Sequence, residues 1–200
     1  MKEFWNQRYA THETVYGKAP NLYFKSILDS LTPGSLLMPA EGEGRNAVYA
    51  ASLGWKVEAF DYSSVAQEKA LQLAEANDVT IKYDVLELNE FKANKQYAAI
   101  GLIYVHLPTK ERFVFHQKMI DALLPGGVLI IEAFSKAQIN NASGGPKDIE
   151  QLYSLDQLKQ DFASLNCIQA VEIEIDLEEG PFHIGNANLV RYFAKKVQPS

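Results

Sequence analysis

Short apolar runs alternate with helical patterns through the middle of the chain, and this alternation restricts the possible fold more than any other feature. The segments between the runs carry apolar residues at helical spacing, at about 45–53, 65–77 and 109–123. Nearly continuous apolar strands separated by helices are typical of a parallel sheet that is covered on both faces. The runs are SLLMPA (35–40), KVEAFD (56–61), VTIKYD (79–84), YAAIGLIYV (97–105) and GVLIIEAF (127–134).

The pattern changes after residue 150. A helix near 154–164 leads to CIQAVEIEIDL (167–177), and a loop separates this run from NLVRYFAKK (188–196). The last two runs can pair as an antiparallel hairpin at the edge of the sheet. We therefore predict an α/β fold: a Rossmann-like, doubly wound and mostly parallel seven-stranded sheet with a C-terminal antiparallel hairpin.

A glycine-rich turn, AEGEGRN, follows the first predicted strand. Glycine lets the backbone approach a ligand closely, and the amides at the start of the next helix favour an oxygen-rich group. Ligands of doubly wound sheets bind beyond the carboxyl ends of the strands. We therefore expect this turn to line a binding site through Ala40, Glu41, Gly42, Gly44 and Asn46.

Acidic residues also mark the ends of the second and third predicted strands. Asp61 is placed to accept from two ribose hydroxyls, and Tyr62 is its neighbour in the same site. Asp84 is placed to accept from an adenine amino group, while the Val85 amide faces a ring nitrogen. Because these features fall at successive strand ends, they predict a site for an adenosine moiety. Each has a structural alternative: the turn as a tight connection, Asp61 as a helix cap, and Asp84 as a turn residue.

The motif alone leaves two cofactors open. GEGRNA fits the dinucleotide fingerprint with alanine in the last place, and Asp61 lies about where a ribose-binding acid belongs. This favours an NAD-binding oxidoreductase. Two features oppose it. No room remains after the sheet for a separate substrate domain, and about 35 residues of helix and loop precede the turn, where they can lie across the cofactor as a lid.

The order of the motifs resembles that of class I S-adenosylmethionine-dependent methyltransferases over nearly the whole chain. The motifs are AEGEGRN, the acid of FDYSS, YDVLEL and LLPGGVLIIEAF. More narrowly, FWNQRY…VYGKAPN, EGEGRNAVYAASLGWKVEAFDYS, HLP and GGPKD resemble the tellurite-resistance and thiopurine methyltransferase-like branch. The resemblance implies a seven-stranded sheet with a reversed C-terminal hairpin, S-adenosyl-L-methionine as the cofactor, and a loop that carries Tyr16 over this cofactor.

Two positions depart from the family pattern. The family commonly has an acidic residue two places before the first glycine of the turn, where it helps to hold the methionine amino group. Met38 occupies that place here, and Ala40 replaces the first glycine. Glu41 is a candidate to compensate for the missing acid.

The resemblance and the strand pattern together predict a single methyltransferase domain, 1–200, in three parts. We expect a helical lid segment over 1–32 and a cofactor-binding core over 33–135. A substrate-side loop, a helix and the C-terminal hairpin follow over 136–200.

The acceptor side is expected beyond the fourth strand. Tyr104 ends this strand and lines the cofactor, beside the position of the transferred methyl group. His106 is either a catalytic base or a cap of the turn into LPTKER. His183 lies on the hairpin loop that can close over the pocket and is a second catalytic candidate. Arg45 is expected to reach a substrate carboxylate or to form a surface pair, and Arg191 to attract an anionic acceptor or to lie in solvent.

Charge and composition oppose several other classes. The formal net charge of −6 argues against a nucleic-acid binder, which needs clustered Lys and Arg. The sequence has no run of about 18 apolar residues and no signal-like start, so we expect a cytoplasmic protein without a membrane segment. No acidic or histidine cluster has metal-ligand spacing, so no metal is expected. We expect Cys167 to be a buried, reduced core residue, and the protein to be a monomer.

The leading hypothesis is methyl transfer from S-adenosylmethionine to a small-molecule nucleophile, such as a thiol or a chalcogen oxyanion. Because the sulfonium leaving group needs no protonation, alignment and dehydration can supply most of the catalysis. One alternative is a non-catalytic S-adenosylmethionine-binding scaffold or sensor, which the departures at Met38 and Ala40 favour. The other is the NAD-binding oxidoreductase.

Overall fold

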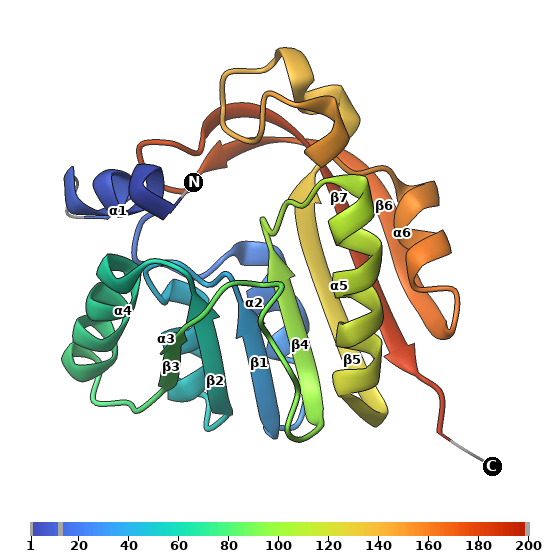
Figure 1. Cartoon of the computed structure of the whole chain (residues 1–200), viewed down its shortest axis with the longest axis horizontal. Coiled ribbons are helices and arrows are strands. Elements are labelled where there is room, and N and C mark those ends of the chain that lie inside the picture. The colour runs from blue at the N-terminus through green and yellow to red at the C-terminus, as the bar shows by residue number, and fades with distance from the viewer. Residues whose placement is uncertain (1, 12–13, 199–200) are drawn as a thin grey trace. The chain divides into compact units, whose positions relative to one another are not determined.

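The computed structural model describes residues 2–11 and 14–198. Within these residues, seven strands form one mixed sheet in the order β3-β2-β1-β4-β5-β7-β6 (Figure 1). The chain divides into two compact units, Met1–Phe91 with Glu179–His183 and Lys92–Glu178 with Ile184–Ser200. The predicted α/β class, the seven-stranded sheet and the C-terminal antiparallel hairpin are confirmed.

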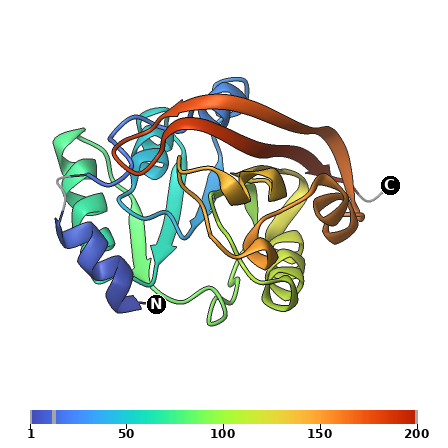
Figure 2. The same ribbon diagram turned by 90° about the horizontal axis from the view of Figure 1, so that it is seen from above.

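The first unit contains the parallel strands that follow the N-terminal helices. Met38 lies opposite Ala59, and Ala59 lies opposite Tyr83, so the carboxyl ends of the three strands share one edge. The first helix lies next to the fourth (Figures 1 and 2). The elements are α1 (Lys2–Thr11), α2 (Leu22–Leu28), β1 (Ser35–Pro39), α3 (Arg45–Ser52), β2 (Lys56–Asp61), α4 (Ser64–Ala76) and β3 (Lys82–Val85).

Side-chain caps explain where two helices of this unit begin. Asn21 precedes α2 and accepts a hydrogen bond from the Phe24 amide at 2.9 Å. Ser63 precedes α4 and accepts from the Ala66 amide at 3.2 Å. Such caps satisfy amides that have no partner inside the helix. Gly44 precedes α3 and has no side chain to act as a cap, so the acceptor for this helix must come from elsewhere in the turn.

The second unit carries the longer strands. Strands β4 and β5 are parallel, whereas β7 is antiparallel to both β5 and β6. Strands β6 and β7 form a long antiparallel hairpin (Figure 2). The elements are β4 (Tyr97–Ile103), α5 (Thr109–Ala122), β5 (Leu123–Phe134), the 3-10 helices η1 (Lys136–Asn140) and η2 (Ile149–Gln151), α6 (Leu155–Asp161), β6 (Leu165–Glu178) and β7 (Ile184–Lys196).

A buried ion cluster joins α5 to α6 in this unit. Arg112 Nε and His116 Nδ1 lie 2.7 and 2.8 Å from Asp161 Oδ2. Burial lowers the pKa of His116. Burial opposes ionisation of Asp161, but hydrogen bonds from His116 and Arg112 outweigh it and lower the pKa of this carboxyl. The cluster therefore keeps its charges compensated, which a buried ion requires.

Two expectations for the second unit are wrong. The sequence predicts the fifth strand over 127–134, but β5 begins four residues earlier, at Leu123. Cys167 is exposed rather than buried. It lies on β6, the last strand in the sheet order, where the register with β7 also shifts between Cys167 and Gln169.

Across the part of the chain that the structure describes, no helix has the length and apolar character needed to cross a bilayer.

Candidate functional site

The turn between β1 and α3 is built on left-handed backbone conformations. The φ angles of Ala40, Gly42 and Gly44 are 50°, 63° and 84°. Glycine reaches this region without strain, whereas alanine does not. A Cβ on Gly42 would lie 2.8 Å from the Tyr9 hydroxyl, and one on Gly44 would lie 2.6 Å from the Ala70 Cβ. Packing within the unit is therefore sufficient to require both glycines.

Glu41 caps α3 from within this turn. Its Oε1 accepts hydrogen bonds from the backbone amides of Asn46 and Ala47, both at 2.8 Å, and the Asn46 side chain donates to Oε2 at 3.4 Å. Burial raises the pKa of Glu41 to about 7, although these hydrogen bonds oppose the shift. The carboxyl group therefore fills the anion-binding position at the start of the helix.

Two further side chains of the turn hold the N-terminal segment. Glu43 Oε2 accepts from the Val15 amide at 2.7 Å, and its Oε1 pairs with Lys69 Nζ at 2.9 Å. Asn46 Oδ1 accepts from the Asn21 amide at 2.8 Å. Glu43 is not among the predicted site residues, although its position between the two glycines of the turn could have indicated it.

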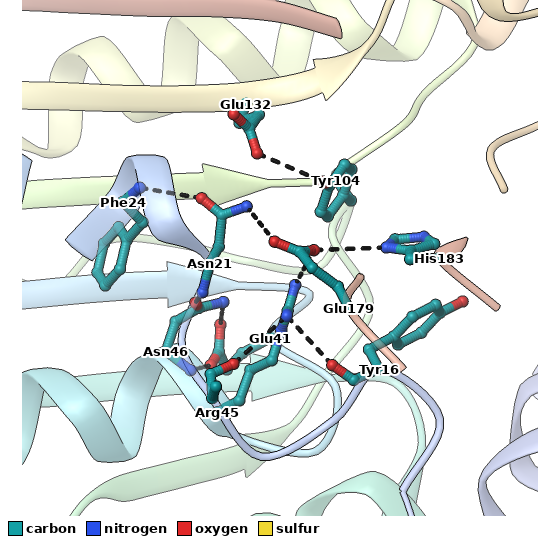
Figure 3. A network of polar contacts seen from close by, with 11 residues as sticks. Tyr16, Asn21, Phe24, Glu41, Arg45, Asn46, Tyr104, Glu132, Glu179 and His183 are labelled. Carbon is teal, nitrogen blue, oxygen red and sulfur yellow. Dashed lines mark hydrogen bonds and ion pairs between the residues drawn. The ribbon is translucent and has the colours of Figure 1, made fainter. Parts of the chain in front are cut away.

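Arg45 joins the turn to the tip of the β6–β7 hairpin (Figure 3). Its Nη2 lies 2.8 Å from Glu179 Oε2, and its Nη1 donates to the Tyr16 and Ala19 carbonyl oxygens at 3.1 and 3.4 Å. The ion pair is buried, because only 8% of the Arg45 side chain and 13% of the Glu179 side chain are exposed. Arg45 thus pairs with Glu179 of its own chain, and this pair is buried rather than on the surface.

Glu179 lies at the centre of this cluster. Its Oε1 accepts from Asn21 Nδ2 at 2.9 Å, and its Oε2 lies 3.6 Å from His183 Nδ1. Burial opposes ionisation, but His183 and Arg45 outweigh it and lower the pKa of Glu179 to about 2. Burial lowers the pKa of His183. A permanently ionised carboxylate therefore faces a histidine that is neutral at pH 7.

Tyr16 and His183, which were predicted from distant parts of the sequence, lie side by side. Their ring centroids are 4.4 Å apart at an interplanar angle of 47°. Trp5 lies 6.3 Å from Tyr16, and both rings pack with Phe182 around the buried Tyr9. Trp5 is thus part of the packing of the unit, whereas Tyr16 also belongs to the polar cluster around Arg45.

Asp61 ends β2 and is 5% exposed. Its Oδ1 accepts from the Ser63 amide at 2.9 Å. Burial raises the pKa of Asp61 to about 6, although backbone amides of Ser63, Gly42 and Tyr62 favour the carboxylate. The side chain that caps α4 is Ser63, so the alternative of Asp61 as the helix cap is wrong. Burial also raises the pKa of the half-buried Tyr62.

Asp84 and Val85 end β3 on the same edge but are more open. The Asp84 side chain is 58% exposed and its Oδ2 pairs with Lys82 Nζ at 3.3 Å. Val85 lies directly opposite Asp61 in the register and is 38% exposed. The structure therefore brings Asp61 and Val85 together, while the carboxylate of Asp84 lies in solvent beside a lysine.

In the second unit, Tyr104 follows β4 with a φ of 55°. Its hydroxyl lies 3.3 Å from Glu132 Oε1 (Figure 3). Its ring centroid lies 5.0 Å from that of Phe134. Glu132 is 1% exposed and pairs through Oε2 with Arg191 Nε at 2.5 Å. Arg191 therefore faces a buried acid of its own fold and does not lie in solvent. Glu132 was not predicted, although it is the lone charge in the apolar run GVLIIEAF.

His106 is held by the main chain at both ring nitrogens. Its Nδ1 lies 2.8 Å from the Gln151 carbonyl oxygen, and its Nε2 lies 3.3 Å from the Phe134 amide nitrogen. The carbonyl needs a donor and the amide needs an acceptor, which assigns the proton to Nδ1 of a neutral ring. The ring also packs on Tyr153. This arrangement favours a structural role over that of a general base.

Several solved structures share the fold of this chain. A structure described in work on the conversion of a disulfide bond into a thioacetal group during echinomycin biosynthesis has 16% identity and a TM-score of 0.78, over 100% of this chain and 94% of that one. TehB from Haemophilus influenzae has 17% identity and a TM-score of 0.75, over 98% of this chain and 66% of that one. The N-methyltransferase NodS from Bradyrhizobium japonicum WM9, in complex with S-adenosyl-L-homocysteine, has 10% identity and a TM-score of 0.71, over 98% and 97%. The chain therefore has the same fold as these proteins.

The sequence then identifies the family. The model of the family described as tellurite resistance protein TehB matches residues 2–176. The chain therefore belongs to the TehB family, and the predicted membership of the tellurite-resistance branch is confirmed. A search of curated proteins found no match.

Proposed function

We propose that the protein is an S-adenosylmethionine-dependent methyltransferase that acts on a small-molecule nucleophile. The family and the fold support a methyltransferase, and one contact carries the choice of cofactor. A dinucleotide places its pyrophosphate on the amides at the start of the helix after β1. In this protein the corresponding amides are those of Asn46 and Ala47, and both already donate hydrogen bonds to the Glu41 carboxyl. An adenosyl sulfonium has no phosphate and leaves this cap undisturbed.

The first unit fits an adenosine ligand in its donor and acceptor chemistry. Asp61 supplies a buried carboxyl group at the end of β2, and a carboxylate can accept from two ribose hydroxyls. Val85 lies opposite it at the end of β3 and is partly open. When bound, the cofactor supplies an electrophilic methyl group on its sulfonium sulfur.

The residues of this chain then act mainly by orienting the reactants and excluding water. Such positioning can contribute roughly 7–11 kcal/mol to a reaction of this type. Because both nitrogens of His106 are held by the main chain, we propose that the acceptor binds already ionised, as a thiolate or a chalcogen oxyanion. His183 is neutral at pH 7 and is the candidate base for an acceptor that arrives protonated.

Calorimetric titrations with S-adenosylhomocysteine and, separately, with NAD test the choice of cofactor. We expect the full chain to bind S-adenosylhomocysteine and not to bind NAD. Binding of NAD alone would refute the proposal. A non-catalytic scaffold would bind S-adenosylhomocysteine but transfer no labelled methyl group to thiols, selenite or tellurite.

Asp61→Asn tests the ribose contact. The change keeps the size of the side chain and removes its charge, so we expect S-adenosylhomocysteine to bind roughly tenfold more weakly or worse. Asp84→Asn is the matched control: its carboxylate is 58% exposed, and its loss should have a smaller effect. Full affinity in Asp61→Asn would contradict the proposed contact.

A further inference from the structure

The amino-acid end of the proposed cofactor carries an ammonium and a carboxylate, and burying it requires groups of opposite charge. The end of β1 offers no acid, because the buried Met38 stands there. Glu41 accepts from amides of its own helix. Glu43 is bound to the Val15 amide and to Lys69. The acids of the turn are therefore used within the protein.

Glu179 and Arg45 present both charges next to this turn (Figure 3). Arg45 directly follows Gly44 and begins α3. Its guanidinium lies 2.8 Å from Glu179 Oε2, and 13% of the Glu179 side chain remains accessible. A carboxylate offers about four acceptor positions. Asn21, Arg45 and the nearby His183 use three of them. The Glu179 carboxylate can therefore accept from a further donor.

The groups around Glu179 suit a cationic partner. The pKa of Glu179 is about 2, so its negative charge is present at every working pH. The pKa of His183 is lowered by burial, so this ring adds no positive charge at pH 7. Tyr16 is also neutral, because burial raises the pKa of its hydroxyl. An ammonium that approaches Glu179 therefore meets Arg45, which can in turn pair with the ligand carboxylate. A second cation, Arg8, lies near Tyr16 and His183.

We propose that Glu179 and Arg45 bind the amino-acid end of the cofactor, Glu179 accepting a hydrogen bond from its ammonium and Arg45 pairing with its carboxylate. This inference rests on the proposed function. Glu179 and Arg45, which hold the hairpin tip to the turn by their own ion pair, would then each form an ion pair with the ligand as well. The contact that positions the tip would thus become part of the ligand site.

Two ligands that differ in the amino-acid end test this proposal. S-Adenosylhomocysteine carries that end, whereas 5′-methylthioadenosine keeps the adenosine and the sulfur without it. We expect Glu179→Gln to weaken binding of S-adenosylhomocysteine roughly 10- to 100-fold and to change binding of 5′-methylthioadenosine by no more than about twofold. Calorimetry on the full chain at pH 7 measures both affinities.

The outcomes separate recognition from a purely structural role. Equal weakening of both ligands would show that Glu179 only holds the hairpin tip in place, and this would overturn the proposal. Unchanged binding of S-adenosylhomocysteine would also overturn it. If the unmodified protein binds neither ligand, the proposed function itself fails.

Control variants address charge and folding. Glu178→Gln removes the same charge from an exposed neighbour on β6 and should leave both affinities unchanged. Glu179→Asp keeps the carboxylate and should recover part of the lost affinity for S-adenosylhomocysteine. This second variant keeps the proposal testable if Glu179→Gln does not fold, because a shortened acid should still weaken one ligand and spare the other.

Discussion

Ala40 occupies a backbone conformation that suits glycine. Its φ of 50° lies in the left-handed region, which costs an L-residue about 1–2 kcal/mol. We expect Ala40→Gly to raise the free energy of unfolding by about 1 kcal/mol, because relief of this strain exceeds the added freedom of glycine in the unfolded chain. Denaturant unfolding followed by circular dichroism measures the change.

Ala51→Gly is the matched control for this prediction. Ala51 lies within α3, where glycine is less favourable than alanine by about 1 kcal/mol. The same substitution should therefore lower the free energy of unfolding there. A similar loss at both positions would show that Ala40 is not strained.

Glu41 illustrates what a local motif can and cannot predict. The sequence places an acid in the glycine turn, but an acid at that point can face a ligand or its own helix. The structure shows that it faces the amides of Asn46 and Ala47. A physical signal was present, because Gly44 at the N-cap has no side chain and α3 needs an acceptor from upstream. Glu41 therefore caps its own helix, and its role in place of the acid missing at Met38 stays a prediction.

The start of α4 depends on a single hydroxyl. Ser63 Oγ accepts from the Ala66 amide at 3.2 Å. Loss of such a cap typically costs about 1 kcal/mol, so Ser63→Ala should lower the free energy of unfolding by about that amount. Ser64→Ala, at the exposed first residue of α4, should change it by less than about 0.5 kcal/mol. Equal effects in thermal or denaturant unfolding would contradict a capping role for Ser63.

Most helices and strands could be predicted because each carries its own periodic pattern. Strand β2 and helix α3 begin and end within about a residue of their predicted limits. The predictions that failed concern features that depend on contacts with neighbouring strands. The start of β5 at Leu123 depends on pairing with Tyr97 of β4, and the exposure of Cys167 depends on its place in the edge strand β6.

The polar clusters of the two units could not be predicted, because they join residues far apart in the chain. Glu179 meets Arg45 across 134 positions and Asn21 across 158. Arg191 meets Glu132 across 59 positions. Local periodicity contains no information about such pairs. The sequence could therefore indicate which strand ends share one edge of the sheet, but not which charged side chains neutralise one another.

The buried acid Glu41 in the turn makes the stability of the folded chain depend on pH. Burial raises the pKa of Glu41 from 4.5 to about 7, so the folded chain binds this proton more tightly than the unfolded chain. The contribution of Glu41 to stability is thus fully present below pH 4.5 and is lost as the pH rises through about 7. Glu41→Gln mimics the protonated form and removes this dependence. We expect the melting temperature of the unmodified protein minus that of Glu41→Gln to fall across this range in scanning calorimetry without ligand.

We expect the contribution of Glu179 to stability to change with pH in the opposite direction. Comparing the two acids tests whether their partners cause the pKa shifts. Its pKa is lowered from 4.5 to about 2, so its contribution is present above pH 4.5 and is lost as the pH falls through about 2. The difference in melting temperature between the unmodified protein and Glu179→Gln should therefore increase from pH 2 to 4.5. If the two differences changed with pH in the same direction, the two carboxyl groups would not be responding to their different partners. Opposite slopes would show that these two carboxyl groups respond to their partners and not to burial alone.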